Sequence, residues 1–298
     1  MKLKSKFIIK FIYFIIMFTE RKFFFKFYYI GGYKFHGSQR QGSIPSIEKS
    51  LIDVLIEKNY INEVRSSEFQ SASRTDRYVS ARGAVFSLKT KKKPILMEIN
   101  SSLPKEIGLW AYTPVPDNYS PRFNAILRYY KYIVPYPYSY LKRMYNIDLD
   151  LMKKACDIIK GTHNFQNFSK KSNEFIKNIR EMKYVSLEFE NDVLTMDFKS
   201  QGFLRQQIRR IVKKILELGM GEITLNDFKK LFDTSKNISY QPADPNGLIL
   251  WDIEYDSNVH FIVDEKSLKR LHQFFHNQMY DYWIRYNLFN IMQKYDFS

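Results

Sequence analysis

The sequence predicts an α+β fold, because strand-like and helix-like segments occur along one chain and because its apolar content is enough for a sizeable core. Of the 298 residues, 45% are hydrophobic, which argues against disorder as the main state. Alternating or aromatic runs bounded by turn residues predict strands, whereas apolar residues that recur every three to four positions predict helices. The predicted strands are 23–29, 84–89, 128–134, 184–190 and 193–200, and the predicted helices are 45–55, 151–160 and 203–218.

The first predicted elements lie in the N-terminal part of the chain. The aromatic run 23–29 leads into Gly31-Gly32, as a strand entering a turn does. Pro45 and Ser46 then open an amphipathic helix, since both residue types favour the first positions of a helix. Strand 84–89 follows.

The second part of the chain again mixes predicted strands and helices. Helix 151–160 is expected to stop at Gly161, and strands 184–190 and 193–200 are expected to form a hairpin around Asn191-Asp192. The long helix 203–218 should end near Gly219.

Two prolines mark a connection between these parts. Pro135 and Pro137 directly follow the predicted strand 128–134, and proline interrupts strand pairing. We therefore expect the boundary within 133–147. The resulting division is an extension outside the fold, residues 1–22, an N-terminal half, residues 23–135, a C-terminal half, residues 136–256, and a helical extension, residues 257–298, that packs on the body or on a second copy.

The charge balance favours a nucleic-acid partner. Lys and Arg number 47 against 31 Asp and Glu, for a formal charge of +16, and the chain holds 25 Phe and 22 Tyr. Basic, aromatic-rich folded proteins are typical of nucleic-acid binders. The alternative is compositional bias, because an AT-rich genome enriches Lys, Ile, Asn, Phe and Tyr without any function.

Cysteine and histidine usage predicts neither disulfides nor a metal site. Cys156 is the single cysteine, which excludes an internal disulfide, and the five histidines lack metal-ligand spacing. We expect a reducing compartment, the cytoplasm, and no metal.

The N-terminus has some features of a signal peptide. A basic start precedes the apolar run 7–18. However, Lys10 interrupts the run, no small-residue cleavage site follows, and the run is shorter than the roughly 20 residues that span a bilayer. We expect an extension outside the fold, with Met17 as a plausible start. A membrane-associated basic protein is the hypothesis that rests on this run alone.

The segment 73–83 is the most informative for function. It places Asp76 among three arginines, Arg74, Arg77 and Arg82, just before a predicted strand. One carboxylate in a cationic pocket indicates catalysis on a polyanion. The plainer interpretation is that Asp76 caps or pairs with an arginine on a surface loop.

Several separated motifs occur in one order along residues 23–255. They are Ile30-Gly31-Gly32 with Gly37-Ser38-Gln39-Arg40-Gln41, Ser73-Arg74-Thr75-Asp76, Arg128-Tyr129-Tyr130-Lys131-Tyr132, Gly161-Thr162-His163-Asn164-Phe165-Gln166-Asn167-Phe168, Phe203-Leu204 with Ile208-Arg209, and Pro242-Ala243-Asp244-Pro245-Asn246-Gly247-Leu248-Ile249-Leu250. In this order they resemble the tRNA pseudouridine synthase A family. Four positions depart from the family pattern: Ile30, Gly31, Ser38 and Ser80.

The resemblance implies an isomerase that converts uridine to pseudouridine without a cofactor. Asp76 would be the catalytic carboxylate, attacking C1′ or removing a sugar proton. Arg209 would pair with it and favour its ionised form. Without the resemblance, Arg209 is better interpreted as part of an exposed basic helix face.

The resemblance also implies three further site residues. Tyr130 would stack on the target base and help remove the C5 proton, although it is equally an ordinary strand aromatic that shares a face with Tyr132. Arg74 would fill the space that the extruded nucleotide leaves, or else bind a phosphate. Leu248 would line the base pocket, or else belong to the core.

The fold and partners that the resemblance implies are specific. Two similar halves would form a continuous antiparallel sheet with helices on one side and the active cleft between the halves. The chain would act as a homodimer on the 3′ side of the anticodon stem-loop of tRNA. The departures from the pattern leave an alternative, a catalytically weakened tRNA-binding protein or RNA chaperone on the same scaffold.

Overall fold

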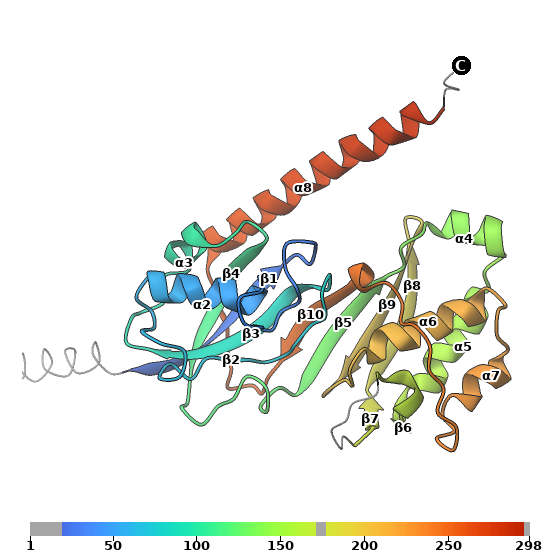
Figure 1. The fold of residues 1–298 in the computed structure, drawn as a ribbon, viewed down its shortest axis with the longest axis horizontal. Helices are drawn as coiled ribbons and strands as arrows, with labels where there is room; N and C mark the ends of the chain where they lie inside the picture. Colours follow the sequence, from blue (N-terminus) through green and yellow to red (C-terminus); the bar gives the residue numbers. More distant parts are fainter. Residues whose placement is uncertain (1–19, 171–176, 295–298) are drawn as a thin grey trace, which may run out of the picture.

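A computed structural model describes residues 20–170 and 177–294 and shows a mixed α+β fold built on one large open sheet. Within these residues the sheet has nine strands in the order β11-β4-β1-β3-β10-β5-β9-β8, with β2 paired to β3 (Figure 1). Its pairings are antiparallel except that of β3 with β10. The strands of this sheet are β1 (Arg21–Tyr29), β2 (Gln70–Ser71), β3 (Ser80–Thr90), β4 (Ile107–Val115), β5 (Leu127–Ile133), β8 (Tyr184–Glu190), β9 (Val193–Ser200), β10 (Leu248–Glu254) and β11 (Ile262–Val263).

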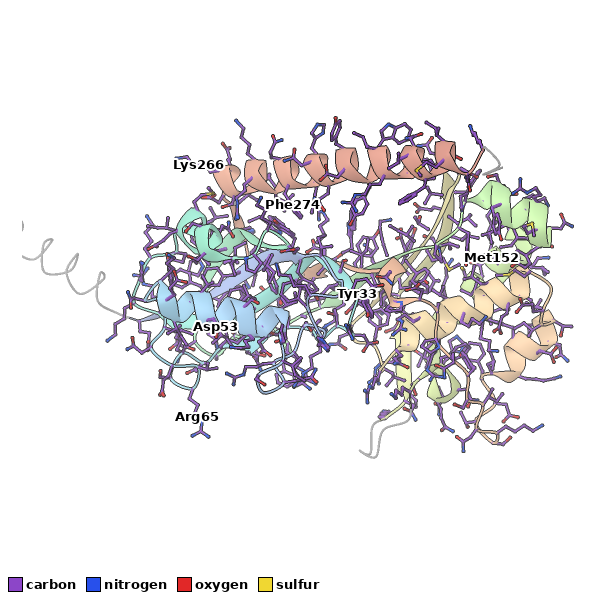
Figure 2. All side chains as sticks on the ribbon, turned by 45° about the horizontal axis from the view of Figure 1, so that its top comes forward. Tyr33, Asp53, Arg65, Met152, Lys266 and Phe274 are labelled. Atoms are coloured by element: carbon purple, nitrogen blue, oxygen red, sulfur yellow. The ribbon has the colours of Figure 1, made fainter. Side chains whose placement is uncertain are left out.

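Helices α2 and α6 are drawn in front of the two parts of the sheet in Figure 1, and α8 runs along its other side in Figure 2. A small second sheet pairs β6 with β7. The remaining elements are α2 (Ile47–Glu57), α3 (Leu96–Ser102), α4 (Tyr138–Tyr145), α5 (Leu149–Ile159), β6 (Gly161–Asn164), η1 (Gln166–Phe168), β7 (Ile179–Met182), α6 (Gln207–Gly219), α7 (Leu225–Lys230), η2 (Pro245–Gly247) and α8 (Glu265–Met292).

The aromatic strand β1 is central to the sheet. It pairs with β3 on one side and β4 on the other, and all its residues after Arg21 are buried. Its Phe25 ring stacks on Phe86 of β3 at a centroid distance of 5.0 Å. Burial on both faces explains why the run lacks the polar alternation of a half-exposed strand.

Local turn and cap chemistry confirms several sequence predictions. Ser46 caps α2, where its side chain accepts a hydrogen bond from the Lys49 amide. The hairpin of β8 and β9 turns at Asn191 and Asp192, which both have positive φ, 49° and 65°, as the favoured two-residue hairpin turns require.

Helix α6 starts at Gln207, four residues later than the sequence predicts. The residue before it, Gln206, has a φ of 60°, and this left-handed conformation cannot continue a right-handed helix. The Gln207 side chain instead accepts a hydrogen bond from the Leu204 amide at 2.7 Å. The segment 203–206 is therefore a turn, and it leads into the helix that carries Arg209.

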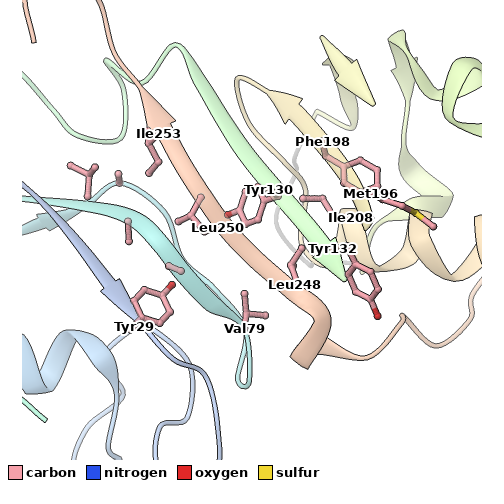
Figure 3. Packing of buried hydrophobic residues seen from close by; sticks show 14 of the residues in the cluster. Tyr29, Val79, Tyr130, Tyr132, Met196, Phe198, Ile208, Leu248, Leu250 and Ile253 are labelled. Atoms are coloured by element: carbon pink, nitrogen blue, oxygen red, sulfur yellow. The ribbon is translucent and has the colours of Figure 1, made fainter. Parts of the chain in front are cut away.

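Strand β10 joins the two parts of the sheet. It pairs in parallel with β3 through Ile249 and Leu250, and antiparallel with β5, where Leu250 lies opposite Tyr130 (Figure 3). Because the Asp76 loop leads directly into β3, this insertion brings that loop beside Tyr130.

The C-terminal segment begins against β4 and then extends away. β11 pairs with Tyr112 and Ala111 of β4. The ring of Phe274 in α8, which is labelled in Figure 2, lies 6.0 Å from the ring of Tyr28. The later part of α8 exposes large apolar side chains: Met279, Tyr280, Tyr282, Trp283, Ile284, Tyr286, Leu288, Phe289, Ile291 and Met292.

The predicted start at Met17 and the apolar run 7–18 lie outside the described residues. Strand β1 begins at Arg21, two residues before the predicted strand. Within 20–170 and 177–294, no helix combines the length and the apolar character needed to cross a membrane.

Candidate active site

The Asp76 loop is fixed by hydrogen bonds at Thr75. The Thr75 amide donates to Ser38 Oγ at 2.7 Å, and the Ser38 amide donates to the Thr75 carbonyl at 3.2 Å. The Tyr29 hydroxyl, buried at the end of β1, lies 2.7 Å from Thr75 Oγ1. The residue before the carboxylate is therefore held from two sides, which limits where Asp76 can point.

Two glycines allow the chain to approach this loop closely. A Cβ on Gly31 would lie 2.2 Å from the Tyr78 carbonyl oxygen, a distance that no side chain can adopt. Gly37 has a φ of 90°, which other residues rarely accept. Tyr78 itself is left-handed, with a φ of 71°, so the chain turns sharply just after Asp76.

Asp76 and Arg209, which are 133 residues apart, form an ion pair. Arg209 Nη1 donates to Asp76 Oδ2 at 2.8 Å, and Arg209 Nε donates to the Ala243 carbonyl at 2.8 Å. Arg209 is buried, whereas 37% of the Asp76 side chain is exposed. A charge-assisted bond to a buried, oriented guanidinium fixes one of the two carboxylate oxygens.

The other carboxylate oxygen, Oδ1, receives no hydrogen bond from any residue in the described part of the chain. Asp76 therefore combines an anchored oxygen with one that a ligand can reach. This arrangement suits a nucleophile or a general base better than a structural cap.

Tyr130 is a buried neighbour of this pair. Burial, with a small contribution from the charge of Asp76, raises the pKa of Tyr130 to about 12 against the opposing effects of Arg128 and Ser73. Its ring packs edge-on against Phe203 at 5.2 Å. Tyr130 and Tyr132 are both buried while Tyr129 is partly exposed, as the predicted alternation of β5 requires.

The two remaining predicted site residues differ in exposure. Leu248 is buried at the start of β10, opposite Tyr132 (Figure 3), whereas Arg74 is exposed on the Asp76 loop. The position of Leu248 agrees with both a core role and a pocket role. Arg74 is open to a ligand.

Arg128 is a residue whose role the sequence interpretation did not identify. Its Nε donates to Ser73 Oγ at 2.9 Å, and its Nη2 donates to the carbonyls of Ala72 at 3.0 Å and Arg122 at 2.9 Å. Nη1 donates to the Gln201 carbonyl. Arg128 thus connects the start of the Asp76 loop to β5 and to the segment before α6. The sequence feature that could have indicated this role is its position as the first residue of the aromatic strand motif.

Three of the four positions that depart from the family pattern make hydrogen bonds at or beside the Asp76 loop, whereas the amide of the fourth, Ile30, donates to the Glu106 carbonyl at 2.9 Å. The Gly31 amide donates to Ser80 Oγ at 3.0 Å, and Ser38 holds Thr75 as described above. Gly31, Ser38 and Ser80 therefore take part in the hydrogen bonds that hold this part of the chain.

Metal-ligating side chains do not gather in the described part of the chain. Within 20–170 and 177–294, no three His, Cys, Asp or Glu side chains lie close enough together to hold an ion. The ionisable side chains that the fold does bring together beside the Asp76 loop include Asp76, Arg209, Tyr130, Arg128 and Tyr29.

Comparison with known proteins gives a consistent result. The family described as tRNA pseudouridine synthase matches residues 155–256. The chain is similar to proteins named tRNA pseudouridine synthase A: 33% identical to that of Methanobrevibacter smithii over 80% of this chain and 85% of the relative, and 35% identical to that of Methanosphaera stadtmanae over 83% and 88%. The corresponding protein of Pyrococcus furiosus is 32% identical, over 80% and 85%. Identity at this level over four fifths of its length shows that the chain belongs to the tRNA pseudouridine synthase A family.

Proposed function

We propose that this protein is an isomerase that converts uridine to pseudouridine in the anticodon stem-loop of tRNA, with Asp76 as the catalytic carboxylate. The observation that carries the proposal is the Asp76–Arg209 ion pair, in which a buried guanidinium holds one oxygen of a partly exposed carboxylate at 2.8 Å. Family membership supports the reaction class.

The reaction breaks the bond between C1′ and N1, turns the uracil and joins C1′ to C5. The proton on C5 is lost and N1 gains one, so neither an oxidant nor a phosphate donor is needed. Ionised Asp76 attacks C1′ or removes a sugar proton as the uracil departs. Both routes need a correctly oriented carboxylate, and Arg209 holds one of its oxygens.

Three other residues complete the proposed site. Tyr130, a neutral phenol, stacks on the uracil and helps remove the C5 proton by hydrogen bonding to the group that accepts that proton. Arg74, exposed beside Asp76, occupies the space that the target nucleotide leaves in the RNA. Leu248 forms an apolar wall of the base pocket.

The target nucleotide has to leave its stack to reach Asp76, at a cost of a few kcal/mol. Contacts to phosphates and stacking on aromatic side chains offset this cost. The formal charge of +16 supports strong and salt-dependent RNA binding.

The alternative, a tRNA-binding protein or chaperone that has lost activity, explains less. A pure binder gains nothing from a carboxylate among the phosphates of its ligand, because the like charges repel. Three of the four departures from the family pattern, Gly31, Ser38 and Ser80, bond to each other or to the Asp76 loop, which argues against a decayed site.

The same proposal covers assembly and location. The part of the sheet around β1 and β3 and the part around β5 and β9 form two similar halves, with the cleft between them at the Asp76 loop. Two copies of the chain bind one tRNA, in the cytoplasm. The boundary near residue 135 stays a prediction.

Release of tritium from tRNA labelled at C5 of uridine tests the proposed function. We expect wild-type protein to release tritium, and pseudouridine mapping to place the product in the anticodon stem-loop. Tight tRNA binding without any release would favour the chaperone alternative instead.

A further inference from the structure

A cavity among the described residues lies at the start of α6. Its volume is about 470 Å³, and its walls are the first turn of α6, the segment 166–170 and the segment 237–242. We call it the α6 cavity. Its lining includes Lys170, Gln206, Arg209, Arg210, Asn237 and Tyr240.

The α6 cavity carries a strong positive charge. Lys170, Arg209 and Arg210 line it, and none of its described lining residues is Asp or Glu. Arg209 is already paired with Asp76, whereas Lys170 is exposed at the edge. Such a pocket attracts an anion.

Arg210 is the least satisfied group of the cavity. It is only 7% exposed, and its Nε has no hydrogen-bond partner among the described residues. Its guanidinium lies over the ring of Tyr240 at 5.2 Å, and Lys214 lies over the same ring at 4.3 Å. A buried, charged donor without a partner is destabilising unless a ligand completes its hydrogen bonds.

The surroundings of Arg210 reinforce this need. Burial lowers the pKa of Arg210, and the adjacent charge of Arg209 lowers it further, with Tyr240 acting in the opposite direction. The positive end of the α6 dipole lies at the same turn, and its cap residue Gln206 makes no side-chain capping bond. Helix N-termini with free donors bind phosphate groups.

We propose that the α6 cavity binds a backbone phosphate of the RNA substrate, next to the nucleotide that reaches Asp76, with Arg210 as its principal ligand. This inference rests on the proposed function for the identity of the RNA. Arg209 contacts both Asp76 and the cavity, so the phosphate would lie about one arginine side chain from the carboxylate.

Phosphate is the anion that fits this chemistry. A guanidinium offers a planar fork that matches phosphate oxygens, and the amide side chains of Gln206 and Asn237 supply further donors. The cavity is larger than one phosphate and lies within the range of about 300–1,000 Å³ that is typical of ligand sites. It therefore has room for the sugar that carries the phosphate.

The test is the salt dependence of tRNA binding for wild type and Arg210→Met. Each phosphate contact contributes about 0.7 to 0.9 to the slope of log K against log salt concentration. We expect Arg210→Met to lower this slope by about that amount for any tRNA sequence. The matched control is Arg65→Met, which removes an exposed arginine that lies far from helix α6 (Figure 2) and should leave the slope nearly unchanged.

Two further variants keep the test decisive if Arg210→Met folds poorly. Lys170→Met removes an exposed cation at the cavity edge and should lower the slope similarly, whereas Arg210→Lys keeps the charge and should retain most of the slope. An unchanged slope in Lys170→Met and in folded Arg210→Met would overturn the proposal.

The source of the phosphate is tested by thermal unfolding in inorganic phosphate. If phosphate stabilises wild type but not Arg210→Met while the RNA slope stays the same, the cavity binds free phosphate and the RNA assignment is wrong. Binding is measured without turnover. A failure of pseudouridine formation would therefore contradict the proposed function and leave the slope result standing.

Discussion

Arg209 and Arg210 are consecutive residues of one helical turn, yet the two sides of that turn differ. On one side, Arg209 bonds to Asp76 and to the Ala243 carbonyl. On the other, Arg210 is buried against Tyr240, and its Nε is unpaired among the described residues. Successive side chains of a helix diverge by about 100°. A single helical turn can therefore carry two different sites. The Arg209–Asp76 ion pair is suited to catalysis, and the unpaired Arg210 is suited to binding an anion.

The largest effect in this comparison is expected for Arg209→Met. Asp76 would lose the donor that orients it, and a small displacement of a catalytic group costs on the order of 10²-fold in rate. The rate constant of a single turnover at saturating tRNA measures this loss. Arg210→Met is the natural control, because it should weaken binding more than it slows the chemical step. Equal losses of the single-turnover rate in both variants would contradict the assignment of Arg209 to catalysis and of Arg210 to binding.

A smaller effect is expected for Gly31→Ala. The added Cβ would clash with the Tyr78 carbonyl oxygen, so the turn after Asp76 would have to move, at a cost of about 1–3 kcal/mol. Thermal unfolding and turnover should both report it. At the neighbouring Gly32 a Cβ would meet no atom within 4 Å, and Gly32→Ala should resemble wild type. A normal Gly31→Ala protein would show that the close packing of this turn is unimportant.

The smallest expected effect concerns pH. Because burial raises the pKa of Tyr130 to about 12, its phenol stays protonated throughout the range in which enzymes are assayed. Between about pH 6 and 10, wild type and Tyr130→Phe should differ in rate but share the shape of their pH–rate profiles. An alkaline inflection in this range that disappears in Tyr130→Phe would show that Tyr130 ionises during the reaction.

Local patterns predicted the local parts of the fold. The aromatic run became β1, Ser46 capped α2, and Asn191-Asp192 formed the hairpin turn. Each depends on a few neighbouring residues. The start of α6 was predicted too early because apolar spacing does not reveal the left-handed Gln206.

The site depends on contacts that local patterns do not contain. The contact between Asp76 and Arg209 joins residues 133 positions apart, and it was expected from the family resemblance alone. The insertion of β10 between β3 and β5 was not predicted. Neither were the hydrogen bonds of Arg128 to Ser73 and Ala72. Both are products of pairing between distant segments, which periodicity within one segment cannot specify.

The most direct test of the central claim compares wild type with Asp76→Asn in single-turnover tritium release from C5-labelled tRNA. The substitution keeps the shape of the side chain and removes its charge, so tRNA binding should persist or tighten. We predict that release falls by at least about 10²-fold, as expected for loss of a positioned general base or nucleophile. Release by Asp76→Asn at the wild-type rate would contradict the assignment of Asp76 as the catalytic carboxylate.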